Sequence, residues 1–268
     1  MPFALGPRAT KAGYGLIALD QVGSTNAEAL TRARAGEPGP CWFVTTEQTA
    51  GRGRRQRAWI APRGNLASSV LETLDVTPAV AATLGFAVGV AMVSALRRVS
   101  LEAALRTGGG QLNFALKWPN DVLANGQKLC GILVEAEQVA AGLAVVVGIG
   151  TNIVAAPTGT PTPAISLNAL GIAVSTEDLF AALSDCWAEY RGIWRDGRGF
   201  PEIRKAWLDC AAGLGQPVAI SSGNAVIEGT FETIDEQGCM VVRTTEGRLV
   251  PITAGDVYFG TAATARAL

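Results

Sequence analysis

The segment 52–57 reads RGRRQR and places four arginines in six residues, although the formal net charge of the 268-residue chain is only −1. An arginine guanidinium is planar and always charged, and it binds a carboxylate or phosphate through two parallel hydrogen bonds. Gly51 and Gly53 flank Arg52, and glycine lets the main chain approach a ligand closely. A solvated basic turn is the plainer alternative, but the interleaved glycines favour an anion-binding loop. We call residues 51–57 the arginine loop; it lacks the Gly-Lys-Ser/Thr ending of a P-loop.

The segment 117–121, KWPND, predicts a second polar site where a strand ends. Pro119 favours an extended conformation at the residue before it and stops the strand. The Asn120 amide has a donor and an acceptor and can pair with an adenine edge. Asp121 can hold Mg²⁺ or orient an incoming amine. Pro-Asn-Asp is also ordinary turn composition, so this segment alone leaves both interpretations open.

Two further stretches combine glycine with polar residues. Lys128 follows a hairpin signal and Gly131 lies in the same predicted strand, an arrangement that suits a cation facing a ligand against bare backbone. On these residues alone, a solvent-facing strand lysine is the favoured interpretation. Residues 148–152, GIGTN, imitate the start of a dinucleotide-binding fingerprint. Because Ile153 replaces the third glycine and no helix pattern follows, we reject a Rossmann fold.

Composition excludes several kinds of chemistry. Histidine is absent, which removes Ser-His-Asp and Cys-His catalysis and histidine metal ligation. The five cysteines are scattered without a C-x-x-C pair, which predicts neither a disulfide framework nor a zinc site and indicates a reducing cytoplasm. No apolar signal segment begins the chain. A pI near 5.7 provides no general basic field for nucleic acid.

Strands and helices alternate in the first two thirds of the chain and must position these residues. Asn125-Gly126 predicts a hairpin, and the apolar runs 131–138 and 143–150 predict an antiparallel pair. Ser24 or Thr25 is placed to cap a helix. The other predicted strands are 15–21, 41–46, 65–72 and 112–118, and the predicted helices are 27–35, 176–194 and 200–211.

Residues 79–96 are 18 residues without a charge, at the lower limit for a membrane-spanning helix. Their Ala, Gly and Val content is only weakly hydrophobic for lipid, and Thr77-Pro78 supplies a cap and a first turn. We therefore expect a buried core helix and no membrane partner.

From Gln216 onward, short strands are separated by turn residues at every break, which predicts a small barrel-like β module. The mixture of helices and hairpin-ordered strands before it indicates the α+β class with a mixed or antiparallel sheet. We therefore predict two domains, residues 1–214 and residues 215–268.

In this order and spacing the motifs resemble the biotin–protein ligases, also called biotin–[carboxylase] ligases or holocarboxylase synthetases. The matching pieces are residues 23–26, 47–55, Trp59, 117–121, 128–135 and 148–152. The resemblance covers about residues 15 to 260. It implies a biotin-ligase catalytic domain followed by a C-terminal SH3-like β-barrel. The winged helix-turn-helix of repressor-type members is missing, so transcriptional repression is not expected.

The resemblance also implies the reaction and its participants. Biotin and MgATP would give biotinyl-5′-AMP, and a lysine of a biotin carboxyl carrier domain would then take the biotinyl group. The implied catalytic residues are Lys128, Asp121 and Arg54. Biotin would be bound by Ser24, Thr25, Asn26, Gln48, Gly51, Arg52, Gly53, Arg54, Lys128 and Gly131. ATP would be bound by Arg55, Trp59, Lys117, Asn120 and Asn152, and no protein ligand for the metal is assigned.

Departures and alternatives remain. Gln56 stands where the family usually has glycine, and Cys130 where alanine is commoner. A nucleic-acid-binding module would use the arginines as phosphate contacts, but the chain has no other basic patch. A catalytically inactive biotin or adenylate sensor is the main alternative function. The sequence leaves open which carboxylase is served and whether the protein is a homodimer.

Overall fold

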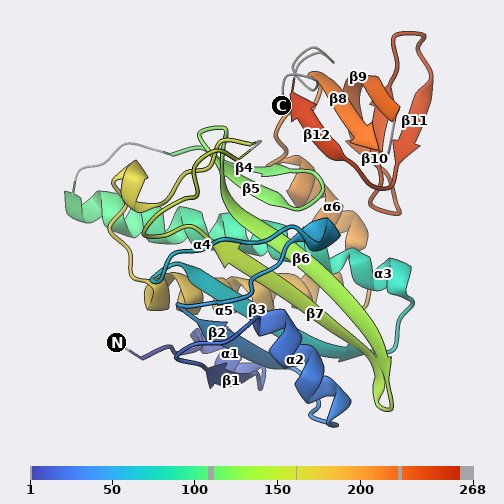
Figure 1. Ribbon diagram of the computed structural model, residues 1–268. Coiled ribbons are helices and arrows are strands. Elements are labelled where there is room, and N and C mark those ends of the chain that lie inside the picture. Colours follow the sequence, from blue (N-terminus) through green and yellow to red (C-terminus); the bar gives the residue numbers. More distant parts are fainter. Residues whose placement is uncertain (1, 108–111, 161, 223–224, 260–268) are drawn as a thin grey trace.

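The computed structural model describes residues 2–107, 112–160, 162–222 and 225–259, so parts of the predicted domain 215–268 lie outside the described residues. A seven-stranded sheet has the order β1-β2-β3-β7-β6-β5-β4 (Figure 1). Only the β1–β2 pair is parallel, which makes the sheet mixed, as predicted. The strands are β1 (Gly15–Ala18), β2 (Cys41–Thr45), β3 (Leu66–Leu74), β4 (Phe114–Lys117), β5 (Asp121–Ala124), β6 (Gln127–Val139) and β7 (Gly142–Thr151).

Helices cover both faces of this sheet. α4 (Leu84–Thr107) and α5 (Thr176–Trp194) pack together on one face. α2 (Thr25–Arg34) packs on the other face against β2, β3 and β7. The remaining helices are α1 (Pro7–Lys11), α3 (Pro78–Ala82), α6 (Phe200–Leu208) and two short 3₁₀ turns, η1 (Arg54–Gln56) and η2 (Asn168–Leu170).

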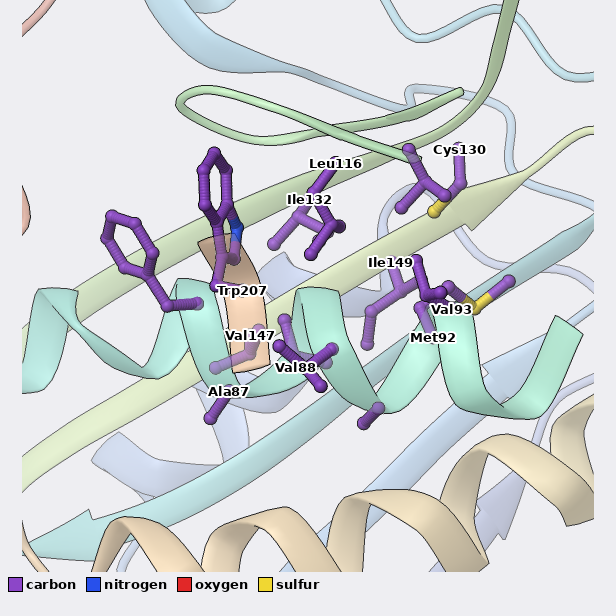
Figure 2. Close-up of a cluster of buried hydrophobic side chains, with 14 of the residues drawn as sticks. Ala87, Val88, Met92, Val93, Leu116, Cys130, Ile132, Val147, Ile149 and Trp207 are labelled. Carbon is purple, nitrogen blue, oxygen red and sulfur yellow. The ribbon is translucent and has the colours of Figure 1, made fainter. Parts of the chain in front are cut away.

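The uncharged segment is part of the core, as predicted. The Thr77 side chain accepts from the Val80 amide and caps α3, and α4 follows. The stretch Pro78–Arg106 is long and apolar enough to cross a membrane by length and composition, but 72% of its apolar window is buried inside the protein. Val88, Met92 and Ala87 of α4 meet residues of β6 and β7 (Figure 2).

The turn between β5 and β6 forms where the sequence predicts it. Asn125 and Gly126 have φ values of 49° and 81° and form the hairpin between β5 and β6. The GIG residues lie inside β7 and lead into no helix, which agrees with rejecting a Rossmann fold. Helix α1 was not predicted, because its five residues are too few to show a periodic pattern. Helix α6 ends at Leu208, three residues before the predicted end.

The last part of the chain forms an antiparallel sheet with the order β11-β10-β9-β8-β12, which we call the C-terminal sheet. Its turn-separated strands confirm the predicted small β module, although the boundary after Leu214 itself stays a prediction. Trp118 Nε1 donates to the Gly238 oxygen at 3.1 Å and ties the C-terminal sheet to the large domain. The strands are β8 (Pro217–Ser222), β9 (Ala225–Ile234), β10 (Met240–Arg243), β11 (Leu249–Ile252) and β12 (Asp256–Phe259).

Trp42 on β2 gives a stability test of the contact between the sheet and α5. It is fully buried, and its ring meets those of Phe180 and Trp187 edge to face, while its Nε1 has no hydrogen-bond partner among the residues that the structure describes. Trp42→Ala should reduce the free energy of unfolding by about 3–5 kcal/mol in urea titrations. Trp42→Phe should reduce the free energy of unfolding by less than about half of that amount. It keeps an aromatic ring and removes an N–H group that is buried without a partner in the described structure. Equal losses for the two variants would contradict this packing.

Candidate functional site

A cavity of about 290 Å³ lies where the arginine loop, the start of α2, strands β4 to β7 and the C-terminal sheet meet. Fourteen of the sequence-predicted site residues line it, and they come from segments far apart in the chain. Gly51 and Arg55 do not: Gly51 lies against Gln48 and Trp59, and Arg55 reaches toward the C-terminal sheet. The lining predicted residues are Ser24, Thr25, Asn26, Gln48, Arg52, Gly53, Arg54, Trp59, Lys117, Asn120, Asp121, Lys128, Gly131 and Asn152.

One end of the cavity is a buried polar network around the start of α2. Ser24 caps the helix by accepting from the Ala27 amide, which fixes Thr25 and Asn26 in the first turn. Gln48 Oε1 accepts from the Thr25 amide at 2.8 Å and from its hydroxyl at 3.1 Å. These side chains offer amide and hydroxyl groups in fixed orientations, which suits a small ligand with its own N–H and C=O groups.

Two residues of this network were missed by sequence reasoning. The Ser69 hydroxyl lies 2.7 Å from Thr25 Oγ1 and 2.6 Å from Asn26 Oδ1. Glu135 accepts from Asn26 Nδ2 at 2.8 Å and pairs with Arg52 at 3.2 Å. Glu135 fell within the motif match, but nothing in the sequence indicated that it faces α2.

The middle of the cavity has a floor of glycine backbone. Gly131 and Gly150 face each other across β6 and β7, and Trp59 lies over both. A Cβ built on Gly150 would come within 2.5 Å of the Trp59 ring, and one on Gly148 within 2.1 Å of Asn26 Oδ1. Any side chain at these positions would clash with Trp59 or Asn26, so glycine is what allows those two residues to lie against the strands.

Cations gather at the other end. Lys128 Nζ lies 2.7 Å from Asp121 Oδ1 and 5.5 Å from the centre of the Trp59 ring. Arg54 has no carboxylate partner among the described residues; it donates to Asn120 Oδ1 at 3.2 Å, and burial lowers the pKa of its guanidinium. Lys117 is also buried without an ion pair in the described ranges, and burial lowers the pKa of its amine.

The two asparagines predicted to bind ATP differ in their hydrogen bonding. Asn120 Nδ2 donates to the Ile132 oxygen at 2.7 Å, and its Oδ1 accepts from Arg54. Both side-chain polar atoms of Asn152 are buried without a partner within the described structure. A buried unpaired amide costs free energy unless a ligand satisfies it. Asn152 therefore has the free donor and acceptor on this wall.

The C-terminal sheet closes one side of the cavity through β12 and Gly255 before it. Asp256 accepts from Arg55 at 3.1 Å and from Arg57 at 2.7 Å. Lys117 Nζ lies 6.0 Å from the Tyr258 ring and 5.5 Å from the Phe259 ring. Asp256, Arg57 and Tyr258 were not among the predicted site residues, because the two sheets meet only in the folded protein.

Within the described residues, no group of three or more His, Cys, Asp or Glu side chains could hold a metal ion alone. Mg²⁺ commonly keeps several waters and binds through substrate phosphates and one or two carboxylates. Asp121 lines the cavity and would serve as such a carboxylate. The donor set therefore fits a Mg²⁺ that arrives with a polyphosphate.

The cavity can bind two anionic groups near a fixed polar end and a flat floor. The buried Lys117 and the half-buried Arg54 have no ion pair among the described residues, and desolvated cations of this kind favour an anionic ligand. Without histidine, the arrangement suits a reaction in which neutralising and aligning two anions matters more than abstracting a proton.

Comparisons with known proteins show which families and folds the chain resembles. A model of the "Biotin/lipoate A/B protein ligase family" matches residues 22–152, and one of the "Biotin protein ligase C terminal domain" matches residues 213–260. A "Biotin--[acetyl-CoA-carboxylase] ligase" from Paracoccus denitrificans is 40% identical over 249 residues, which cover 90% of this chain and 99% of the relative.

Two solved structures have similar folds. A biotin protein ligase from Aquifex aeolicus in complex with biotin and ATP has a TM-score of 0.75 and 23% identity, covering 92% of this chain and 99% of that one. Because the identity is only 23%, this match shows that the fold is similar and nothing further. A biotin protein ligase from Leishmania major in complex with biotinyl-5-AMP has a TM-score of 0.60 and 26% identity, covering 90% and 99% of the two chains.

Lys117 gives a pH test of the cavity. Burial lowers its pKa below the 10.5 of an exposed lysine, so between the two values the unfolded chain binds more protons. The contribution of Lys117 to the free energy of unfolding is therefore least favourable when the amine is protonated in the folded protein. It becomes more favourable as the pH rises from the lowered pKa to 10.5. The Lys117→Met variant should be more stable than wild type at neutral pH, and this advantage should shrink toward pH 10.5. Urea titrations over this range measure it, with the exposed Lys205→Met as control; an advantage independent of pH would contradict the assignment.

Proposed function

The chain belongs to the biotin–protein ligase family, and we propose that it attaches biotin to a lysine of a biotin carboxyl carrier domain through biotinyl-5′-AMP. The observation that carries the proposal is a pair of cations that line the cavity, the half-buried Arg54 and the buried Lys117, which have no carboxylate partner in the described structure. The amide network at α2 and the unpaired Asn152 amide line the same cavity. Together these groups suit a ureido head, a carboxylate joined to a phosphate, and a nucleobase.

In the first half-reaction, the biotin carboxylate attacks the α-phosphorus of ATP and pyrophosphate leaves. The carboxylate is already ionised at pH 7, so the step needs no general base. Arg54 and Lys128 would neutralise the carboxylate and phosphate and hold them in line. Mg²⁺, bound with ATP near Asp121, would add positive charge at the phosphates. These roles account for a ligase site without histidine.

The polar network and the floor would fix the rest of the ligand. Thr25, Gln48 and Asn26 would pair with the ureido group of biotin, and Ser69 would orient them. Trp59, whose ring lies on Gly131 and Gly150, would pack against the flat part of the adenylate. Asn152 would read the adenine edge, because the Asn120 amide is already satisfied by Arg54 and the Ile132 carbonyl.

In the second half-reaction, the carrier lysine attacks the acyl carbonyl carbon, the bond to the phosphate oxygen breaks and AMP leaves. Asp121 would orient the incoming amine and accept its proton. In the ligand-free protein Asp121 pairs with Lys128, so a bound phosphate would have to draw Lys128 away before the amine arrives.

We further propose that the acceptor belongs to a biotin-dependent carboxylase and that neither nucleic acid nor a membrane takes part. All five cysteines are unpaired, which supports the proposal of a reducing, cytoplasmic location. A homodimer is compatible with the exposed edge position of β1 in the large sheet.

Pyrophosphate release on adding biotin and ATP tests the function. Wild type should release pyrophosphate, whereas Lys128→Ala should do so about ten- to a hundredfold more slowly, since a charge-assisted contact contributes roughly 1.5–3 kcal/mol. Lys205→Ala, on the exposed side of α6, is the matched control. Tight biotin binding without pyrophosphate release by wild type would identify an inactive sensor instead.

Asp121→Asn separates the two half-reactions. It keeps the size of the side chain but removes the proton acceptor, so transfer to a carrier domain should slow more than adenylate formation. Pyrophosphate release gives the first rate, and label transfer from preformed adenylate to carrier gives the second. Equal losses in both would assign Asp121 to the metal or to the fold rather than to the amine.

A further inference from the structure

Asp256 joins the C-terminal sheet to the arginine loop. It is the first residue of β12, and its carboxylate lies 3.1 Å from Arg55 Nη1 and 2.7 Å from Arg57 Nη2. The Asp256 side chain is 27% exposed and lines the cavity, as Arg57 does. One carboxylate of the C-terminal sheet therefore pairs with two arginines of the loop.

The arginine loop needs an anchor, because its own backbone is strained. Arg55 and Gln56 have φ values of 55° and 59°. These values lie in the left-handed region, which is unfavourable for residues other than glycine. Inside the loop, the Gly53 amide donates to the Arg57 oxygen and the Arg57 amide to the Arg54 oxygen. Consecutive residues of this kind persist only where the surroundings hold them in place.

The C-terminal sheet, in contrast, is held on the large domain by contacts that do not involve Asp256. Trp118 Nε1 donates to the Gly238 oxygen at 3.1 Å. Arg204 of α6 donates to Thr233 Oγ1 at 3.2 Å and to the Ile234 oxygen. Removing the charge of Asp256 should therefore free the loop and leave the C-terminal sheet in position.

We propose that Asp256 is a positioning residue that holds the arginine loop closed over the cavity, so that the C-terminal sheet sets how long the activated intermediate is retained. The identity of that intermediate rests on the proposed function, whereas the anchoring of the loop does not. An acyl-adenylate is a mixed anhydride. Once released, its carbonyl carbon is attacked by any lysine amine, which forms an amide as AMP leaves and the amine loses a proton.

The test compares Asp256→Asn with two matched variants. Glu232→Gln removes a carboxylate from the same sheet that pairs with Arg243 at 2.8 Å, and Asp256→Glu keeps the charge. Hydrogen exchange of the ligand-free proteins at residues 53–57 and 231–238 reports the loop and the docking of the sheet separately. Release of labelled adenylate is then followed at low and high salt, with serum albumin as a bystander acceptor.

Asp256→Asn should speed exchange at residues 53–57 but not at 231–238. It should release adenylate about three- to tenfold faster and label more albumin, since each partly exposed ion pair contributes modestly. Salt should speed release from wild type and have less effect on Asp256→Asn, because salt screens such pairs. Asp256→Glu should restore wild-type behaviour, and Glu232→Gln should retain it.

Unchanged exchange at residues 53–57 in Asp256→Asn would overturn the proposal, as would faster exchange at 231–238 or an equal effect of Glu232→Gln. Faster loop exchange with unchanged adenylate release would overturn the retention role. If wild type makes no adenylate at all, the proposed function fails. The exchange data then still decide whether Asp256 anchors the loop.

Discussion

The mutual repulsion of the cations around one cavity is the constraint on which this structure depends. Six Lys and Arg side chains lie in or beside it, and each buried positive charge raises the free energy of the folded protein unless it is paired. Three carboxylates from different elements form ion pairs with four of these cations. Glu135 of β6 pairs with Arg52, Asp121 of β5 with Lys128, and Asp256 of β12 with Arg55 and Arg57. The cations are Arg52, Arg54, Arg55, Arg57, Lys117 and Lys128.

Two of the six cations have no carboxylate partner among the described residues, which favours the binding of an anionic ligand. Arg54 and Lys117 have only neutral hydrogen-bond partners, Asn120 and Thr162, within the described residues. Burial lowers the pKa of both groups, because removing a positive charge from water costs free energy and favours the neutral form. A bound carboxylate and phosphate would offset that cost, so part of the ligand's affinity is already present as unfavourable energy in the empty site. This preorganisation replaces the acid–base chemistry that a histidine would provide elsewhere.

Rigid elements hold these charges at fixed positions. The floor of the cavity is the glycine-lined centre of β6 and β7, whose other face packs on α4 (Figure 2). Cys130 is fully buried there, and burial raises the pKa of its thiol to about 12, so it acts as a small apolar side chain. The arginine loop is the part without such support. Mobility of the site is therefore expected where the strained backbone of Arg55 and Gln56 meets Asp256.

The sequence by itself determined the elements and the chemistry of this protein. The Asn125-Gly126 hairpin, the Thr77 cap and the Ser24 cap follow from local backbone preferences, and the succession of short strands after Gln216 follows from turn residues at each break. The loop of arginines indicated an anion-binding site, the absence of histidine excluded histidine chemistry, and the motif order indicated the family, which alone implied the roles of Lys117, Asp121 and Lys128.

Only the tertiary structure decided which partner each side chain has. Nothing local distinguishes Asn120 from Asn152, yet the Ile132 carbonyl of β6 accepts from the Asn120 amide, whereas the Asn152 amide has no partner in the described part of the chain. Ser69 and Glu135 join the site because strand register turns them toward α2, and Asp256 joins it because the C-terminal sheet docks beside the arginine loop. Contacts between residues far apart in the chain depend on the packing of whole elements, and no short pattern records that packing.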